Sequence, residues 1–503
     1  MLSKAYPGNI SFKKALDLAP GTWLHTLLLI SAISLAFYMA LLPKLPYQYP
    51  LHVDEWLHLD EAKRILYQGG LPTPIHREAG FHVLLAEISV ITGLDWYSIF
   101  RWFPAILYAT TVLLTYLLGR RFGCGLESAF FATLVPTTIR ALGPAFLVPV
   151  SLGMLALPLL MYIVLSLPET KVRGAVLAAV VFAFIWVVHP GSAILLTLLM
   201  VVCSLLMVTT KSDETLIQRL RRVLIVAGLA AIPVIGFLLW RHDLVSRTLG
   251  SLEGLRGSDT LPPIANLGLE MGSVTIAFFI FGTFYLLFKG GREEFSLVGS
   301  AAVMIGLIFL YYRTHIGVQT LADRVWLHLA LMVGFIAGFG ASTIRSWNPM
   351  KSSHGMRNGF TLAASLAVFI MVTIAVVTGY QRNKSELYYQ LVDDRTASDF
   401  QWIDENLDPK KRLTVLRTDM AIAYSAVTQG RVYATEAFPF TNQTGQEAMR
   451  FLFAESSGPP SDMDWMITTK EVGLVYAPNW YDGGTLFDQL RPGIFVPTKI
   501  TTR

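Results

Sequence analysis

Residues 23–42 of the chain read WLHTLLLISAISLAFYMALL and contain no Lys, Arg, Asp or Glu. A helix of about 20 apolar residues is long enough to cross the hydrocarbon core of a bilayer. The whole chain of 503 residues shares this character, with 53% hydrophobic residues, 15% charged residues and a mean hydropathy of +0.51. Because soluble domains carry roughly 25% charged residues, the composition predicts an integral membrane protein.

Further apolar runs follow along the sequence, and together they predict an α-helical polytopic membrane protein with about eleven transmembrane helices. The expected spans are 23–42, 103–119, 127–139, 144–167, 174–188, 192–209, 223–240, 272–288, 296–312, 325–343 and 360–379. The run at 127–139 is the shortest, and the number of spans decides on which side of the membrane the tail lies.

Lys and Arg concentrate in alternate connecting segments, which the positive-inside rule assigns to the cytoplasm. We therefore expect a multi-pass cell-membrane protein with a cytoplasmic N-terminus, and with the loop 43–102 and the tail on the outer side. The same bias accounts for the net charge of +5, so we expect no nucleic-acid partner. The basic residues assigned to the inner side are Lys4, Lys13, Lys14, Arg120, Arg121, Lys171, Arg173, Lys211, Arg219, Arg221, Arg222, Lys289, Arg292, Arg345, Lys351 and Arg357.

The composition changes after the last predicted span, which divides the chain into a transmembrane domain, 1–379, and an outer soluble domain, 380–503. Helical patterns at 397–406 and 445–455 alternate there with short β-like runs at 413–416 and 473–476. This alternation predicts a small extracytoplasmic α/β domain.

The first outer loop contains the sequence LHVDEWLHLDEAKRILYQGG at 51–70. Leu57, Ala62, Ile65 and Leu66 predict an amphipathic helix that could lie at the membrane interface and end at the two glycines. Asp54 and Glu55 fall at its N-terminus, where the helix dipole favours negative charge. They could be capping residues on a solvated loop or functional carboxylates, whereas Asp60 and Glu61 read as solvated helix charges.

The order of these features resembles the start of the GT-C polytopic glycosyltransferases, which include protein O-mannosyltransferases and lipid A aminoarabinose transferases. The matching features are the Asp-Glu pair soon after the first span, a His three positions later, a second loop helix at 81–92, and a span that opens with Phe103-Pro104 and closes at Gly119-Arg120-Arg121-Phe122-Gly123. The resemblance covers residues 1–170 in motif order and the whole chain in layout, at the level of the superfamily.

The resemblance implies transfer of a sugar from a polyprenyl-phosphate donor in the bilayer to an acceptor hydroxyl at the outer face. The acceptor would be a protein, a glycolipid or a polysaccharide. A carboxylate near a low-dielectric boundary can have a raised pKa, which suits a general base. We expect Asp54 to be this base in an inverting reaction, Glu55 to orient the acceptor or hold a cation, and His58 to bind sugar or phosphate.

A departing polyprenyl phosphate needs cationic partners, because negative charge develops on it in the transition state. The candidates are Arg313, His315 and Arg324 in the loop before span 325–343, and Arg140 before span 144–167. Each arginine could equally be a snorkelling interface anchor. Arg324 is preferred because it adjoins Asp323 at the head of a span, while His189 reads as a structural polar residue.

No spacing matches a dedicated metal motif, so no cofactor is expected with certainty. A divalent cation held among Asp54, Glu55, His58 and His82 stays an open alternative. Two other functions also stay open: a carrier or flippase for a lipid-linked anionic substrate, and a non-catalytic GT-C-like assembly subunit. Transporters usually place charged groups at mid-bilayer, and the nearly charge-free spans favour the glycosyltransferase.

Overall fold

The structure is a computed structural model. It describes residues 23–68, 78–137, 142–209, 263–314, 319–346, 354–385 and 391–406 in continuous stretches. Shorter described pieces are 412–415, 418–427, 436–437, 472–476, 487–491 and 494–497, with the single positions 228 and 236. The chain divides into two compact units. The helical unit comprises Met1–Pro46, Arg77–Phe81 and Phe100–Tyr388, and the loop-and-tail unit comprises Tyr47–His76, His82–Ile99 and Tyr389–Arg503.

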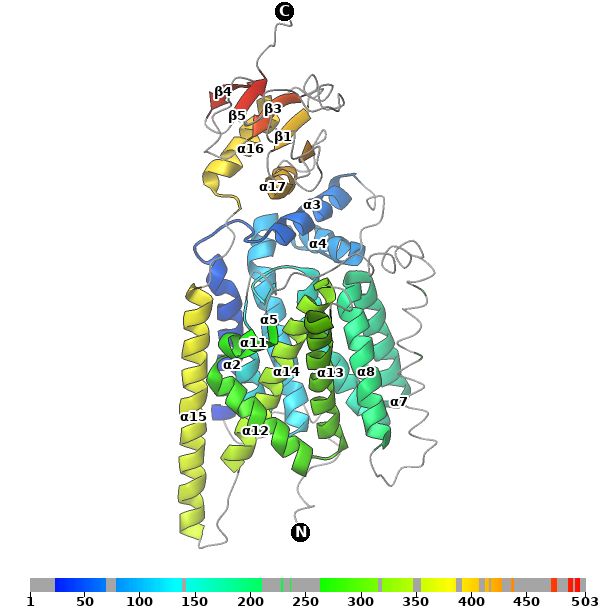
Figure 1. The fold of residues 1–503 in the computed structure, drawn as a ribbon, viewed down its shortest axis with the longest axis vertical. Coiled ribbons are helices and arrows are strands. Elements are labelled where there is room, and N and C mark those ends of the chain that lie inside the picture. The colour runs from blue at the N-terminus through cyan, green and yellow to red at the C-terminus, as the bar shows by residue number, and fades with distance from the viewer. Residues whose placement is uncertain are drawn as a thin grey trace, which may run out of the picture. The chain divides into compact units, whose positions relative to one another are not determined.

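Long apolar helices form the helical unit (Figure 1). They are α2 (Trp23–Leu41), α5 (Trp96–Arg121), α7 (Pro149–Val188), α8 (Pro190–Thr209), α12 (Ser273–Lys289), α13 (Arg292–Thr314), α14 (Gln319–Ser346) and α15 (His354–Ser385), with the shorter η1 (Leu42–Lys44), α6 (Gly125–Ala132) and α11 (Pro263–Met271). Within the described residues, six stretches are long and apolar enough to cross a membrane: Trp23–Lys44, Trp96–Arg121, Pro149–Ser166, Glu293–Arg313, Arg324–Ser346 and Gly359–Ser385. The chain is thus a mostly helical, multi-pass membrane protein.

Three other predicted spans appear as shorter apolar helices, Arg173–Val188, Pro190–Leu206 and Ser273–Lys289. Of the predicted span 223–240 the structure describes only positions 228 and 236, so the total number of spans stays a prediction. Helix α7 is not one straight rod, because its two ends lie together. A Cβ on Gly153, near its start, would lie 2.0 Å from the Oγ of Ser192, just after its end. Pro149–Ser166 and Arg173–Val188 are therefore two limbs that run in opposite directions.

The prediction of a spanning helix at 127–139 is wrong, because α6 contains only 8 residues and ends at Ala132. Pro136 explains the early end, since a proline lacks an amide hydrogen and its ring collides with the carbonyl four residues before it. Two other helices satisfy the carbonyls exposed at this end. The hydroxyl of Tyr108 donates to the carbonyl of Ala132, and Arg382 donates to that of Leu134 at 3.2 Å.

The chain between α6 and α7 is described at residues 133–137 and 142–148, which are non-helical and buried. A Cβ on Gly143 would lie 2.2 Å from the carbonyl oxygen of Pro136, so only glycine fits there. The hydroxyl of Thr137 accepts the Ala145 amide hydrogen at 3.2 Å, and that of Ser151 donates to the Phe146 carbonyl at 2.9 Å. Non-helical backbone is tolerated at membrane depth only where protein groups satisfy it, as they do here.

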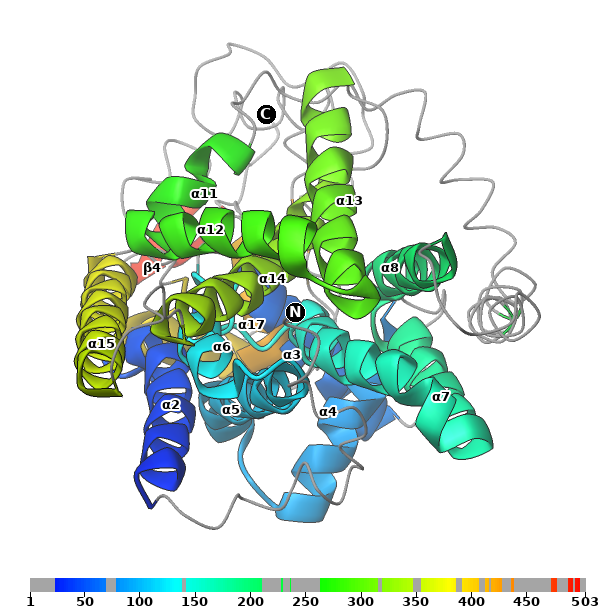
Figure 2. The same ribbon diagram turned by 90° about the horizontal axis from the view of Figure 1, so that it is seen from below.

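Helix α14 is deeply enclosed, with 83% of its apolar window buried, the same fraction as in the first limb of α7. Figure 2 shows it lying among α6, α12 and α13. Small residues allow this close packing. A Cβ on Gly340 or Gly282 would lie 2.3 or 2.4 Å from a carbonyl oxygen of the facing helix, and one on Gly338 would lie 2.3 Å from the amide nitrogen of Ser128 in α6. By contrast, the apolar window of α15 is only 11% buried, as expected of a lipid-facing helix.

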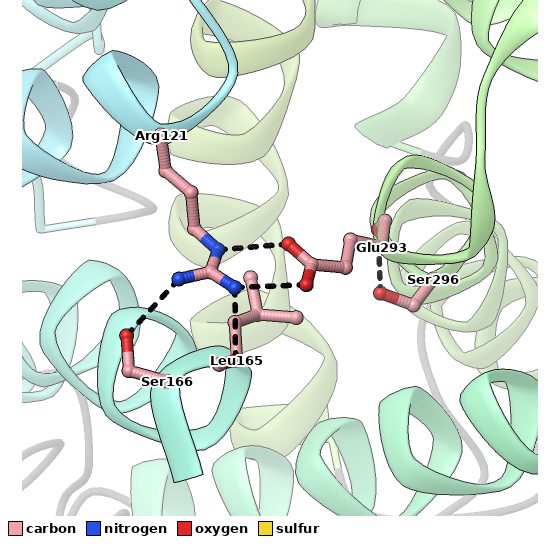
Figure 3. Close-up of polar contacts among 5 residues, drawn as sticks. All are labelled: Arg121, Leu165, Ser166, Glu293 and Ser296. Atoms are coloured by element: carbon pink, nitrogen blue, oxygen red, sulfur yellow. Dashed lines mark hydrogen bonds and ion pairs between the residues drawn. The ribbon is translucent and has the colours of Figure 1, made fainter. Parts of the chain in front are cut away.

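An arginine joins three helices at one end of the helical unit, here called the Arg121 end (Figure 3). The Nε and Nη2 of Arg121 each donate to one carboxylate oxygen of Glu293, both at 2.8 Å. The same guanidinium donates to the hydroxyl of Ser166 at 3.3 Å and to the carbonyl of Leu165 at 3.1 Å. Bidentate pairs of this kind are strong and directional, so the contact fixes α5, the first limb of α7 and the start of α13 to one another.

The loop-and-tail unit combines α3 (Val53–Gln68) and most of α4 (Ala79–Thr92) with α16 (Asp394–Asn406), α17 (Thr418–Val427) and a sheet of 5 strands. The strands are β1 (Arg412–Val415), β2 (Glu436–Ala437), β3 (Val472–Tyr476), β4 (Phe487–Arg491) and β5 (Ile494–Pro497), in the order β2-β1-β3-β5-β4. β1 pairs in parallel with β2 and β3, while β5 pairs antiparallel with β3 and β4. The predicted tail helix at 445–455 lies outside the described residues.

The expectation that Asp60 and Glu61 are solvated is wrong, because they are 3% and 4% exposed. Asp60 accepts a hydrogen bond from the Ser425 hydroxyl of α17 and lies 2.9 Å from Arg64. Lys63, on the same side of α3, donates to the carbonyl of Ala426 and lies over the Tyr97 ring. The amphipathic pattern of α3 therefore serves packing against the tail, with a polar contact between α3 and α17 that we call the α3–α17 clamp.

Candidate active site

At the N-terminus of α3, Asp54 is partly exposed and Glu55 is buried. His52 caps the helix, because its Nδ1 accepts the backbone amide hydrogen of Asp54 at 3.1 Å. The Asp54 carboxylate is 32% exposed and lies 3.9 Å from that imidazole. Glu55 is 0% exposed and its Oε2 accepts the Leu51 amide hydrogen at 2.9 Å. Glu55 therefore holds the turn, and Asp54 is the more exposed member of the pair.

His58, in the loop-and-tail unit, is buried and contacts another histidine. It is 5% exposed, and its Nδ1 lies 2.9 Å from the Nε2 of His82 in α4, which is 3% exposed. One ring donates and the other accepts, so this contact ties α3 to α4. The prediction that His58 binds sugar or phosphate therefore requires a buried side chain, already in contact with His82, to make that contact.

The alternative of a cation site is not supported by the geometry of the predicted ligands. Among the described residues, no three His, Cys, Asp or Glu side chains are arranged to hold a metal ion. The structure therefore does not gather Asp54, Glu55, His58 and His82 around one point.

A second polar group lies in the helical unit, at the end opposite Arg121. We call it the His189 cluster: Glu78, His189, Ser192, Arg324 and His328. His189 stands between α7 and α8 and caps α8, because its Nδ1 accepts the Ser192 amide hydrogen at 3.0 Å. Its Nε2 lies 3.5 Å from the carboxylate of Glu78.

The hydrogen bonds assign the tautomers in this cluster. Since Nδ1 of His189 accepts from a backbone amide, the ring hydrogen is on Nε2, beside Glu78. Burial, followed by the positive charge of Arg324, lowers the pKa of His189 to about 3, so this ring is neutral at physiological pH. Nδ1 of His328 donates to the Arg324 carbonyl at 2.9 Å, and the Ser192 hydroxyl lies 2.7 Å from His189 and 3.4 Å from His328.

The structure distinguishes among the four predicted phosphate ligands. Arg324 begins the buried part of α14 and is partly exposed, while Arg313 is exposed near the end of α13. Arg140 and His315 lie outside the described residues. Of the two candidates that the structure describes, Arg313 and Arg324, only Arg324 belongs to the His189 cluster.

Sequence reasoning missed Glu78, Ser192 and His328. Two signals pointed to them. His328 is an ionisable residue inside an apolar span, which is generally a functional marker. His189 followed by Pro190 marks a helix start, since proline favours the first helical position and a polar side chain favours the cap before it. Glu78 gave no signal, because its partner His189 is distant in sequence.

The structure is similar to those of several solved membrane proteins. The archaeal oligosaccharyltransferase AglB from Archaeoglobus fulgidus, in complex with an inhibitory peptide and a dolichol-phosphate, aligns with a TM-score of 0.60 and 12% identity over 91% of this chain and 70% of its own. ArnT from Cupriavidus metallidurans, bound to undecaprenyl phosphate, aligns with a TM-score of 0.60 and 12% identity over 95% of this chain and 98% of its own.

The arabinofuranosyltransferase AftD from Mycobacteria aligns with a TM-score of 0.57 and 15% identity, over 90% of this chain and 35% of its own. No family model matches the sequence, and no curated protein matches it significantly. At identities this low, the likenesses establish a shared fold.

Proposed function

Because the chain has the GT-C fold of AglB, ArnT and AftD, we propose that it is a membrane glycosyltransferase. It would transfer a sugar from a polyprenyl-phosphate donor to a hydroxyl of a protein, glycolipid or polysaccharide at the outer face. Two of the similar structures support this donor class, since AglB was solved with a dolichol-phosphate and ArnT with undecaprenyl phosphate. The observation that carries the proposal is the partly exposed carboxylate of Asp54 at the start of α3.

Asp54 is the proposed general base. Its carboxylate takes the proton of the acceptor hydroxyl as the acceptor oxygen attacks the anomeric carbon from the face opposite the phosphate. The bond from that carbon to the phosphate oxygen breaks, and its electron pair leaves with the polyprenyl phosphate. One displacement inverts the anomeric centre and needs no sugar-enzyme intermediate. Glu55 supports Asp54 by holding the turn at Leu51, so its influence on the acceptor acts through that turn.

Arg324 is the proposed ligand of the donor phosphate. A guanidinium offers several fixed donors and keeps its charge in a low-dielectric setting, which suits a phosphate that gains charge as the sugar leaves. Its backbone is fixed by His328 through the carbonyl contact of 2.9 Å. Arg313, exposed near the end of α13, is the second choice.

The positive-inside rule supports an outward-facing His189 cluster. The opposite end of the helical unit carries Arg121, and it also carries Arg345 in a 2.8 Å ion pair with Glu127 at the start of α6. Basic residues favour the cytoplasmic side. With the Arg121 end inside, the end of α15 that leads into the tail faces outward.

The test is sugar transfer by purified protein in lipid nanodiscs, with radiolabelled undecaprenyl-phosphate and dolichyl-phosphate sugars and envelope lipids or glycans as acceptors. Removal of a general base lowers the rate by roughly 10²- to 10⁴-fold, which is the loss expected for Asp54→Asn. Glu405→Gln is the matched control, because Glu405 is exposed on α16 and should leave the rate unchanged. An Asp54→Asn protein with wild-type rate would refute the assignment.

The same protein in sealed vesicles separates the alternatives. A carrier or flippase moves the lipid-linked sugar between leaflets without forming product. An assembly subunit does neither and requires a partner protein. Product that depends on Asp54 is the outcome that supports the glycosyltransferase.

A further inference from the structure

The connection between α4 and α5, residues 88–95, exposes three aliphatic side chains, and we call it the α4–α5 turn. Val90 is 61% exposed, Ile91 is 78% exposed and Leu94 is 49% exposed. The part of the chain that the structure describes places nothing within 4 Å of a Cβ built on Gly93, between them. Single exposed apolar residues are ordinary on a protein surface, but a cluster of them marks an interaction surface.

The backbone of the α4–α5 turn is hydrogen-bonded by the turn itself. Gly93, whose φ of 64° favours glycine, donates its amide hydrogen to the carbonyl of Ser89 at 2.9 Å. The hydroxyl of Thr92 donates to the Ile88 carbonyl at 2.6 Å and accepts the Leu94 amide hydrogen at 3.3 Å. The hydroxyl of Ser89 donates to the Leu94 carbonyl at 3.4 Å. These backbone groups therefore do not depend on water, which is the condition for backbone that enters lipid.

The chain itself brings the turn to the bilayer. One residue, Asp95, separates Leu94 from α5, and the stretch Trp96–Arg121 is long and apolar enough to cross a membrane. Since consecutive Cα atoms are about 3.8 Å apart, the Cα of Leu94 lies within about 8 Å of the start of that stretch. α5 exposes large apolar side chains of its own, with Trp102 42% and Ile106 49% exposed. The apolar cluster is thus continuous along the chain with a helix that faces lipid.

Two exposed carboxylates limit how deeply the turn can enter. Glu87 lies one helical turn before Ile91, and Asp95 follows Leu94 directly. The Oδ1 of Asp95 accepts the Ser98 amide hydrogen at 2.9 Å and so caps α5. A charged carboxylate is costly in hydrocarbon, so the carboxylates stay at the level of the headgroups and only the side chains between them reach the acyl chains.

We propose that Val90, Ile91 and Leu94 insert into the lipid leaflet at the Trp96 end of α5, so that the α4–α5 turn is a membrane anchor of the loop-and-tail unit. In the topology proposed above, this is the outer leaflet. Insertion removes three aliphatic side chains from water and places them beside acyl chains, as in other shallow interfacial anchors. This lipid contact is independent of sugar transfer.

The test measures the surroundings of single positions in the full-length protein, in nanodiscs of phosphatidylcholine and phosphatidylglycerol. Ile91→Cys and Leu94→Cys each receive a nitroxide label, which is selective because the native Cys124 and Cys203 are buried. At both positions the nitroxide should collide more often with oxygen, which concentrates in lipid, than with a water-soluble nickel chelate. Glu87→Cys is the matched control, because it lies at an exposed position of the same helix and should show the reverse ratio.

Two results would overturn the proposal. A nickel collision rate at Ile91 equal to that at Glu87 would mean that the turn lies in water. Protection of Ile91 from both reagents would mean that protein, such as a second copy of the chain, covers the cluster. The unmodified protein gives a second measurement, since a phosphatidylcholine with a photoreactive group on its acyl chain should cross-link to peptides that contain residues 90–94, and a lack of such cross-links would contradict insertion.

Discussion

The α3–α17 clamp makes the stability of the loop-and-tail unit depend on pH. Lys63 is 5% exposed and donates to the carbonyl of Ala426. Burial lowers its pKa from 10.5 to about 8, although the Asp60 carboxylate partly offsets this effect. The charged form of Lys63 is thus disfavoured in the folded unit relative to the unfolded chain.

The direction of the effect follows from proton binding. Below pH 8 Lys63 is protonated in both states, so the penalty is constant. Between pH 8 and 10.5 the unfolded chain holds a proton that the folded unit has released, and the free energy of unfolding therefore rises with pH. Each pKa unit corresponds to about 1.4 kcal/mol, which gives a rise of about 2 kcal/mol between pH values of about 7.5 and 9.5.

The titration of the neighbouring Asp60 carboxylate does not overlap with this alkaline pH window. Burial raises the pKa of Asp60, so its titration affects stability on the acid side.

The assay is pulse proteolysis in graded urea, with a C-terminal epitope to report loss of the tail. We expect the urea midpoint for tail cleavage to rise across the window in the wild type and to stay flat in Lys63→Met. Lys384→Met, at an exposed position of α15, should keep the wild-type slope. The reasoning is refuted if Lys63→Met keeps the slope or if the wild type has none.

Two further predictions concern the helical unit. Arg121→Ala should lower the free energy of unfolding by about 2 kcal/mol, because it removes a bidentate bond to Glu293. Thermal melts of this variant, of Glu293→Gln and of the double variant should show non-additive losses of stability. Additive losses would mean that the two residues do not interact. Gly340→Ala should cost about 1–3 kcal/mol, because its Cβ would lie 2.3 Å from the carbonyl oxygen of Phe278. Gly306→Ala in α13, where a Cβ would meet nothing within 4 Å, should be neutral or stabilising, and equal melting temperatures for the two alanine variants would contradict the packing argument.

The sequence predicted the spanning helices well where one long charge-free run was sufficient. α2, α13, α14 and α15 each match such a run, because the thickness of the bilayer sets the length of the segment that must be apolar. The prediction was wrong at α6, because the apolar sequence continues past the end of the helix. Pro136 was the visible signal of this end, since its ring collides with the carbonyl four residues earlier and stops the helix although the sequence stays hydrophobic.

The candidate site was less predictable because its partners are distant in sequence. The placement of Asp54 in the first turn of α3 followed from local pattern alone. The burial of Asp60 did not, since its partner Ser425 is 365 residues away. His189 was correctly read as structural in part, because it caps α8, but its second contact with Glu78 depends on the tertiary fold.

The short helix α6 has a consequence for how the protein enters the membrane. A translocon recognises segments by hydrophobic length, and a helix of 8 residues with non-helical chain after it cannot persist in lipid alone. One group that completes its backbone hydrogen bonding, the guanidinium of Arg382, is synthesised 248 residues after its acceptor Leu134. The ribosome must therefore finish nearly the whole bundle before this pass is secured, so truncated nascent chains that lack α15 should leave it open to the solvent or to quality-control proteases.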